Sequence, residues 1–296
     1  MKLTKLLSRP DGRNLISAKA INCVQSRVGH LVLYVVLTAG AVVILLPFAW
    51  MISRSLMTER DIFQYPLALL PRALTIDAYI EVWRRIPFDR FFLNSVFFAG
   101  GVTTLSLFFD SMAAFALARL EFRGRKFLFW VVLATLMVPF QITLIPLFVT
   151  VFQVGWLDTF AGLIIPRATN AFGIFMLRQF FITLPKDFDD AARIDGASNF
   201  QIYLHIILPL SKPALATLAI FHFMYNWNDF LWPLVITSST EMRPLPAGLT
   251  LFMGQHVIEN AIIMAGATIS LAPLALAFLI VQKYFIRGVV MSGLKG

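Results

Sequence analysis

The sequence is poor in charged residues and nearly free of cysteine. Only 14% of its 296 residues are charged, whereas soluble domains carry about 25%. Cys23 is the one cysteine, which excludes an intramolecular disulfide and argues against thiol chemistry or a cysteine-based metal site. Apolar residues dominate instead, with 58% of the chain hydrophobic and a mean hydropathy of +0.77. This surplus exceeds what one globular core buries, so the chain needs a non-aqueous environment.

Sequence motifs for nucleotide binding and metal-dependent catalysis are also missing. The chain has no G-x-x-x-x-G-K-[ST] loop and no H-E-x-x-H motif. The acidic group at 187–190 is more typical of a solvated loop than of an acid catalyst. The histidines are scattered along the chain, at His30, His205, His222 and His256. We therefore expect a non-catalytic chain that has no metal and no cofactor of its own.

Six apolar stretches are long enough to cross a membrane. A helix needs about 20 predominantly apolar residues to span the hydrocarbon layer. Pro139 and Pro146 are expected to kink the third stretch. The predicted spans are approximately 31–53, 92–117, 127–152, 159–183, 210–237 and 260–284. The sequence therefore predicts an all-α integral membrane protein, a bundle of about six transmembrane helices. Short helices near the interface are expected in the long first connection, at 54–91.

The distribution of positive charge predicts the orientation of these spans. Counted with the charged residues at the ends of the adjoining spans, the segments before the first span and after the second, fourth and sixth hold 17 lysines and arginines, and the other three connections hold 7. Because such residues concentrate in cytoplasmic loops, both termini are predicted to be cytoplasmic. Residues 1–30 then form a cytoplasmic N-terminal tail, followed by an uncleaved first span. The net charge of +9 suits contact with anionic membrane lipid, so no nucleic-acid partner is expected.

The connection between the fourth and fifth spans is long and has a helical pattern. Pro185 suits a first helical position, and Leu184, Phe188, Ala191 and Ala192 share one face. Such a face must be buried in lipid, in the bundle or in a partner. The neighbouring aspartates disfavour an anionic membrane surface, and the small alanines allow close approach. Docking on a protein is therefore favoured over binding to the membrane surface, and packing on the chain's own bundle is the alternative.

A second short helix is predicted after a glycine. Gly196 is placed to end the first helix, and Ser198 with Gln201 has the spacing of a capping box. The predicted apolar stripe of the second helix is Phe200, Tyr203, Leu204 and Ile207. Residues 185–208 are therefore interpreted as two short helices in a cytoplasmic loop.

One spacing within this segment is specific. Asp190-Ala191-Ala192 is followed by Gly196, and nine residues later by Ile206-Ile207-Leu208-Pro209. This resembles the cytoplasmic signature of ABC importer permeases: Glu-Ala-Ala, three residues, Gly, nine residues, then Ile-x-Leu-Pro. Asp190 stands where that family usually has Glu. The resemblance implies that the segment is a coupling helix seated in a cleft of an ATPase subunit. The residues it implicates in coupling are Phe188, Asp190, Ala191, Ala192, Asp195, Gly196, Leu208 and Pro209.

Outside the first 30 residues the chain resembles one branch of that family, the smaller, second permease subunit of maltose and glycerol-phosphate type sugar importers. The resemblance is carried by Asn94-Ser95, AFALARLEFRGRK at 114–126, YNWNDFLWPL at 225–234 and the final GVVMSGLKG. It implies that residues 31–296 form an ABC transporter transmembrane domain in a bacterial inner membrane. The implied partners are a second, homologous permease subunit, two ATPase subunits that bind ATP and Mg, and a periplasmic or lipid-anchored substrate-binding protein. The implied substrate is a sugar or oligosaccharide.

Polar residues inside the spans are candidates for a sugar pathway. A charge in hydrocarbon costs about 2.5 kcal/mol or more, so such residues face a cavity or a partner. Asp110 and Gln141 are more typical of hydrogen bonds between helices. Arg167 either snorkels to the outer interface or lines the pathway, where it would favour an acidic substrate. The pathway candidates are Arg167, Asn170, Asn226, Trp227 and Asp229. Interhelical bonding is the alternative for Asn226 and Asp229.

Two other classes of function fit the sequence less well. An ion-coupled secondary carrier is expected to show inverted repeats and helices broken at the midplane, and the sequence has no internal symmetry. A membrane-embedded enzyme would need a catalytic constellation that the scattered histidines do not provide. The sequence favours a non-catalytic permease that forms half of a translocation pathway, with ATP hydrolysis in a separate subunit.

Overall fold

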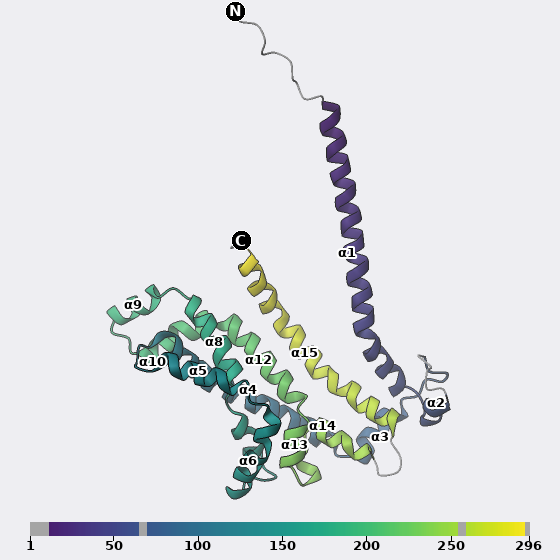
Figure 1. Cartoon of the computed structure of the whole chain (residues 1–296). Coiled ribbons are helices and arrows are strands. Elements are labelled where there is room, and N and C mark those ends of the chain that lie inside the picture. Colours follow the sequence, from purple (N-terminus) through teal and green to yellow (C-terminus); the bar gives the residue numbers. More distant parts are fainter. Residues whose placement is uncertain (1–11, 65–69, 254–258, 294–296) are drawn as a thin grey trace, which may run out of the picture.

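The computed structural model describes residues 12–64, 70–253 and 259–293, with side chains described for 29–64, 70–253 and 259–280. The secondary structure within these ranges is helical (Figure 1). Three helices are long and apolar enough to cross a membrane on their own, and up to six spans result if each bent pair of helices counts as one. The three are α1 (Gly12–Ser55), α4 (Phe88–Arg119) and α15 (Asn260–Gly293). The predicted fold class, an all-α membrane bundle, is confirmed.

The other apolar stretches are broken helices. The third predicted span consists of α5 (Arg125–Thr135) and α6 (Phe140–Gln153), which meet at 97°. Pro139 immediately precedes α6, where a residue without an N–H and with a fixed φ ends one helix and starts another. Pro146 lies inside α6, which continues past it. The fourth stretch holds α7 (Phe160–Ile164), a 3₁₀ turn (Ile165–Arg167) and α8 (Ala171–Thr183), with a bend of 44°.

The segment before the fifth span is continuous with it but sharply bent. The helices α10 (Asn199–Ile202) and α11 (Leu208–Leu210) flank a π-helical turn, Tyr203–Ile207, and α12 (Lys212–Trp227) follows after an 80° bend. Pro209 and Pro213 lie on either side of this bend at Ser211 and withhold two backbone donors there. α13 (Leu231–Ile236) continues the predicted span after a three-residue break.

α4 is the central helix of the bundle. It contacts α8 and α12 along its length, and its side chains contribute to three separate buried clusters. Phe88 and Phe91 lie in the cluster with α3 (Asp77–Arg85) and α15, Phe98 in the cluster with α13, and Phe115 in the cluster with α8 and the π-helical turn. Close van der Waals packing of this kind drives helix association in lipid, because lipid tails are as apolar as the side chains.

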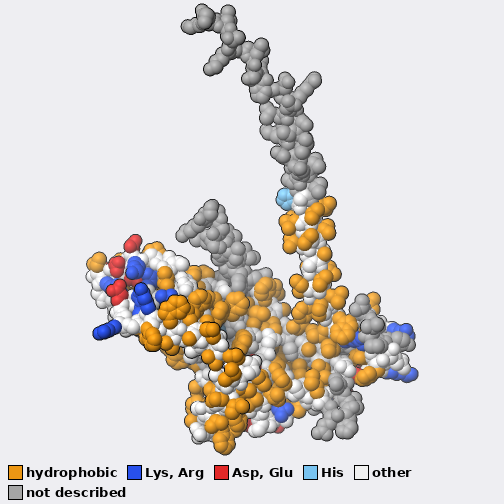
Figure 2. Space-filling model, viewed as in Figure 1, with side chains coloured by type: hydrophobic (Ala, Val, Ile, Leu, Met, Phe, Trp, Pro, Cys, Tyr) orange, Lys and Arg blue, Asp and Glu red, His pale blue; other side chains and the backbone are white. Residues whose placement is uncertain are grey.

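α1 exposes apolar side chains along its described length. In Figure 2 the described part of α1 is largely orange and stands away from the bundle. Leu31 and Val43 are 64% and 70% exposed, and the helix contacts α15. Exposure on this scale suits lipid or a second membrane protein, and in water it would cause aggregation.

Short helices cover the end of the bundle opposite the connection between α8 and α12 (Figure 1). The predicted short helices at 54–91 are present as α2 (Glu59–Gln64) and α3. Glu59 accepts a 2.6 Å hydrogen bond from the backbone N–H of Ala261 in the first turn of α15. Arg85 pairs with Glu259 at 2.7 Å and with Glu81 on its own helix. The remaining elements here are η3 (Thr240–Met242), α14 (Leu245–Gly248) and η4 (Leu249–Phe252).

Candidate functional site

The predicted coupling segment contains two short helices separated by a glycine. The first is α9 (Asp187–Ile194), and Gly196 follows it with φ +84°, in the left-handed region that favours glycine. The predicted capping box of α10 is confirmed, because Gln201 N–H donates to the Ser198 hydroxyl and Ser198 N–H donates to the Gln201 side chain at 2.7 Å. The predicted position of Pro185 is wrong, since α9 begins two residues later.

α9 projects from the bundle and exposes both apolar and acidic side chains. Figure 2 shows red and blue side chains gathered together at this end of the molecule. Ile194 is 86% exposed and Phe188 48%, and Ala191 is exposed as well. We call this surface the α9 knob; it consists of Asp187, Phe188, Asp190, Ala191, Ile194 and Asp195. Sequence reasoning omitted Ile194, although its spacing of three residues from Ala191 places it on the same side.

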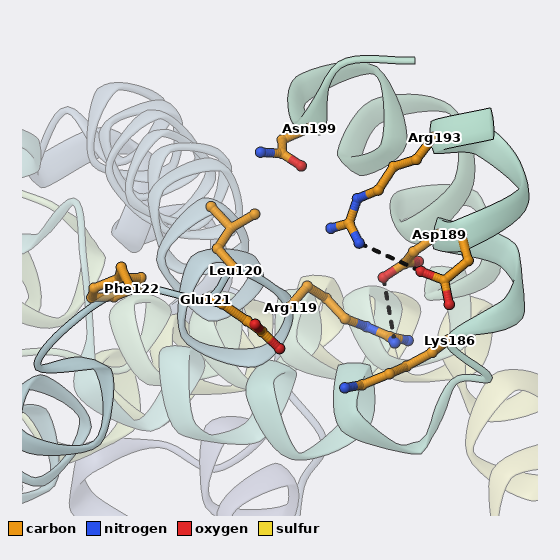
Figure 3. A pocket seen from close by; sticks show the side chains of 9 residues that line it. Arg119, Leu120, Glu121, Phe122, Lys186, Asp189, Arg193 and Asn199 are labelled. Carbon is orange, nitrogen blue, oxygen red and sulfur yellow. Dashed lines mark hydrogen bonds and ion pairs between the residues drawn. The ribbon is translucent and has the colours of Figure 1, made fainter. Parts of the chain in front are cut away.

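The opposite side of α9 is tied to the end of α4 by a buried ion pair. Arg119, the last residue of α4, lies 3.5 Å from the Asp189 carboxylate, and the two side chains are 2% and 6% exposed. Arg119 also donates to the Leu184 carbonyl at 2.8 Å. Figure 3 shows this pair among the residues that line a surface pocket of about 540 Å³. Sequence reasoning missed the pair, because 70 residues separate its members.

The base of the segment is also bonded to α4. The Tyr203 hydroxyl lies 2.8 Å from the Ser111 hydroxyl, and its ring packs against Phe115. Tyr203 and Ile207 are buried as predicted, but Phe200 and Leu204 are 58% and 44% exposed. The predicted apolar stripe is therefore partly wrong. Leu208 is half-buried beside this cluster, whereas Pro209 is exposed.

Two predicted pathway residues, Arg167 and Asp229, meet in the structure. Their charged groups are 3.0 Å apart, and the side chains are 9% and 11% exposed. The guanidinium lies over the rings of Phe140 and Tyr225, at 4.8 and 5.4 Å. Arg167 is thus held by a carboxylate and two aromatic faces and does not snorkel.

The other pathway candidates make contacts within the bundle. Asn170 accepts a hydrogen bond from Phe172 N–H and caps α8. Asn226 is buried and donates to the His222 carbonyl at 2.7 Å. Trp227 is 2% exposed and donates its indole N–H to the Ser270 carbonyl of α15. These contacts place the Trp227 ring in the packed interior, against α15.

Asp110 forms the interhelical hydrogen bonds that its position inside a span predicts. Its carboxylate accepts from the Thr169 hydroxyl at 2.7 Å and from Asn170 N–H at 2.9 Å, and it lies 3.2 Å from His222 Nε2 on α12. A Cβ on Gly173 would lie 2.1 Å from this carboxylate, so the close approach of α8 requires glycine. Asp110 thereby joins α4, α8 and α12. Gln141, in contrast, is exposed on α6.

A cleft of about 620 Å³ opens where α12 gives way to α13. Its lining mixes aromatic, polar and aliphatic side chains: Phe221, Met224, Tyr225, Asn228, Asp229, Phe230 and Leu231. Of these residues, sequence reasoning named only Asp229 as a pathway candidate. The break between α12 and α13, which brings the aromatic residues to the cleft, is not visible in the apolar pattern.

Comparison with known proteins identifies the family. Residues 110–291 match the model of the binding-protein-dependent transport system inner membrane component. The arabinooligosaccharides transport system permease protein AraQ of Halalkalibacterium halodurans is 35% identical over 259 residues, which cover 86% of this chain and 93% of that protein. The sn-glycerol-3-phosphate transport system permease protein UgpE of Brucella abortus is 30% identical over 275 residues, which cover 90% and 98% of the two chains.

Solved structures agree with this assignment. A chain of a bacterial ABC transporter involved in the import of the acidic polysaccharide alginate superposes with a TM-score of 0.77 at 27% identity, covering 95% of this chain and 100% of that one. A chain from the alginate transporter in complex with its alginate pentasaccharide-bound periplasmic protein has a TM-score of 0.59 at 14% identity and shares the fold. The chain therefore belongs to the family of binding-protein-dependent transport system inner membrane components, the permease subunits of ABC importers for sugars and oligosaccharides.

Proposed function

We propose that this chain forms half of the translocation pathway of an ATP-driven sugar importer and that α9 is its coupling helix. The observation that carries this proposal is the α9 knob. In a chain of this family, an exposed helix with the Asp190-Ala191-Ala192 and Gly196 spacing projects from the bundle and presents Phe188 and Ile194 to a partner. Neither solvent nor an anionic membrane surface suits that combination of apolar and acidic groups.

The partner of the knob is an ATPase subunit. The chain has no phosphate-binding loop, so ATP and Mg bind to that separate subunit, and the permease itself is non-catalytic. Two ATPase subunits would serve two permeases, this chain and a second, homologous one. The apolar sides of α1 offer surface for lipid or for that second permease. In this arrangement the α9 end and both termini lie in the cytoplasm of a bacterium.

A substrate-binding protein delivers the sugar on the opposite side. The alginate transporter complex contains such a periplasmic protein, and relatives of this chain are named for arabinooligosaccharides and sn-glycerol-3-phosphate. The short helices α2 and α3 form the surface available for this contact.

Nucleotide-driven closure of the ATPases would move α9, and the Asp189–Arg119 pair would pass that movement to α4. Asp110 then connects α4 to the two helices that border the pathway, α8 and α12. Because packed interfaces have discrete arrangements, such a linkage switches the permease between inward-facing and outward-facing states.

Isolation of the intact complex and its reconstitution test this function. A tagged chain is purified from its native host, co-purifying proteins are identified, and the complex is placed in proteoliposomes with the binding protein. We expect a second permease and an ATPase to co-purify, and sugar uptake to require ATP. Sugar uptake by the purified chain alone, driven by an ion gradient, would contradict the proposal.

A further inference from the structure

A break interrupts the predicted fifth span, 210–237. α12 ends at Trp227 and α13 begins at Leu231, so the backbone at 228–230 is not helical. The length of α12 corresponds to about 24 Å at the rise of an α-helix, which places the break in the half of the membrane away from α9. Non-helical backbone is tolerated there when it is buried in protein or lines a water-filled cavity. The cleft of about 620 Å³ at this break fits the second case.

The walls of the cleft suit a carbohydrate better than a partner helix. Phe221, Tyr225 and Phe230 are 46%, 58% and 41% exposed and offer flat apolar faces, against which the C–H face of a sugar ring stacks. Asn228 is exposed beside them; its amide N–H donates to the Met224 carbonyl at 2.8 Å and its own carbonyl oxygen is available as an acceptor. An apolar helix would bury the carbonyl oxygen of Asn228 without a donor, whereas a sugar hydroxyl would donate a hydrogen bond to it.

The charge at the cleft is balanced. The Asp229 carboxylate is paired with Arg167 at 3.0 Å, and the described residues that line the cleft include no lysine or arginine. A sugar carboxylate or phosphate would therefore be desolvated without a free cation, or would have to displace Asp229 from Arg167. The expectation that Arg167 selects an acidic substrate does not fit this geometry.

We infer that this cleft is a substrate subsite for an uncharged oligosaccharide, contributed by this permease. The inference rests on the proposed function, and it assigns Phe221, Tyr225, Asn228 and Phe230 to stacking and hydrogen bonding with the sugar. Asp229 contributes an acceptor and neutralises Arg167, which sets the preference for uncharged substrates.

The test uses the reconstituted complex and matched aromatic variants. Uptake of arabinotriose, maltotriose and trigalacturonate is measured for the wild type, Phe230→Ala, Asn228→Ala and the control Phe108→Ala, whose ring is 50% exposed on α4. We expect uptake of a neutral trisaccharide, with KM raised at least fivefold by Phe230→Ala and Asn228→Ala and unchanged by Phe108→Ala. Stimulation of ATP hydrolysis by the loaded binding protein should persist in the Phe108→Ala control.

The Asp229→Asn variant tests the charge argument separately. Freeing the Arg167 guanidinium should raise uptake of trigalacturonate relative to the neutral trisaccharides at least fivefold. The inference would be overturned if the wild type imported trigalacturonate and neither neutral trisaccharide, or if Phe230→Ala and Asn228→Ala left the KM for neutral sugars unchanged. The importer function would stand in both cases. Absence of ATP-dependent uptake of any sugar would instead remove the function on which it rests.

Discussion

Separating Arg119 from Asp189 should uncouple ATP hydrolysis from transport. At 3.5 Å the attraction between the two charges is about 5 kcal/mol in a medium of effective dielectric 20, before the cost of burying them. Removing one member of a buried pair costs about 3–5 kcal/mol, because the other charge stays buried without its partner. A loss of about 3 kcal/mol lowers the equilibrium ratio of attached to detached α9 roughly a hundredfold.

The assay is the number of sugar molecules imported per ATP hydrolysed in proteoliposomes. Asp189→Asn should lower this ratio at least tenfold while the ATPase remains bound, and the reciprocal exchange Arg119→Asp with Asp189→Arg should restore part of it. The control is Arg84→Ala, which removes an exposed ion pair with Glu81 of the kind worth about 0–1 kcal/mol. A normal ratio in Asp189→Asn would refute the role of this pair in transmitting movement.

Three further predictions concern single positions. Gly196→Glu places a side chain at a backbone φ of +84°, which favours glycine, and adds a charge beside the α9 knob. The chain should still insert into the membrane, but stimulation of ATP hydrolysis by sugar should be lost. Normal stimulation would remove the assignment of α9 as the coupling helix. Gly173→Ala brings a Cβ against the Asp110 carboxylate and should lower the thermal stability of the complex, whereas Gly100→Ala, where the space is open, should not. Asp158 accepts hydrogen bonds from Ser238 and Ser239; burial opposes ionisation, but these bonds and Arg243 hold the Asp158 pKa below its usual value. A group whose pKa is lowered by folding stabilises the folded protein at pH values above its unfolded pKa, and this stabilisation is lost as the pH falls. The thermal stability of the wild type should therefore exceed that of Asp158→Asn by a constant margin from pH 8 to 5, and this margin should shrink below about pH 4. A margin that grows on acidification would contradict this.

The sequence predicted the fold class well because apolar length and helix-end signals are local. The stretches that become α1, α4 and α15 are continuous apolar runs, and the Ser198–Gln201 capping box depends on residues three positions apart. The change of direction expected at Pro139 is present as the 97° angle between α5 and α6, and the size of that angle was not predicted.

The contacts that give the candidate site its chemistry are not local. The Arg119–Asp189 and Arg167–Asp229 pairs each join residues more than 60 positions apart, and only the folded bundle brings them together. The predicted stripe of the second coupling-segment helix was partly wrong, because Tyr203 and Ile207 pack into the cluster with α4 and α8, whereas Phe200 and Leu204, four residues apart, share the exposed side. The cleft likewise depends on a break whose signal, Asn228-Asp229, is weak.

Crosslinking from the α9 knob tests the central claim most directly. Cys23 is the one cysteine, so Cys23→Ser allows a single cysteine at Ile194, which is 86% exposed, or at the control position Val43 on α1, which is 70% exposed. With a short thiol-reactive photocrosslinker in native membranes, the cysteine at 194 should form an adduct with an ATPase subunit, and the one at 43 should not. Adducts from position 194 that contain only lipid or this chain itself would contradict the account.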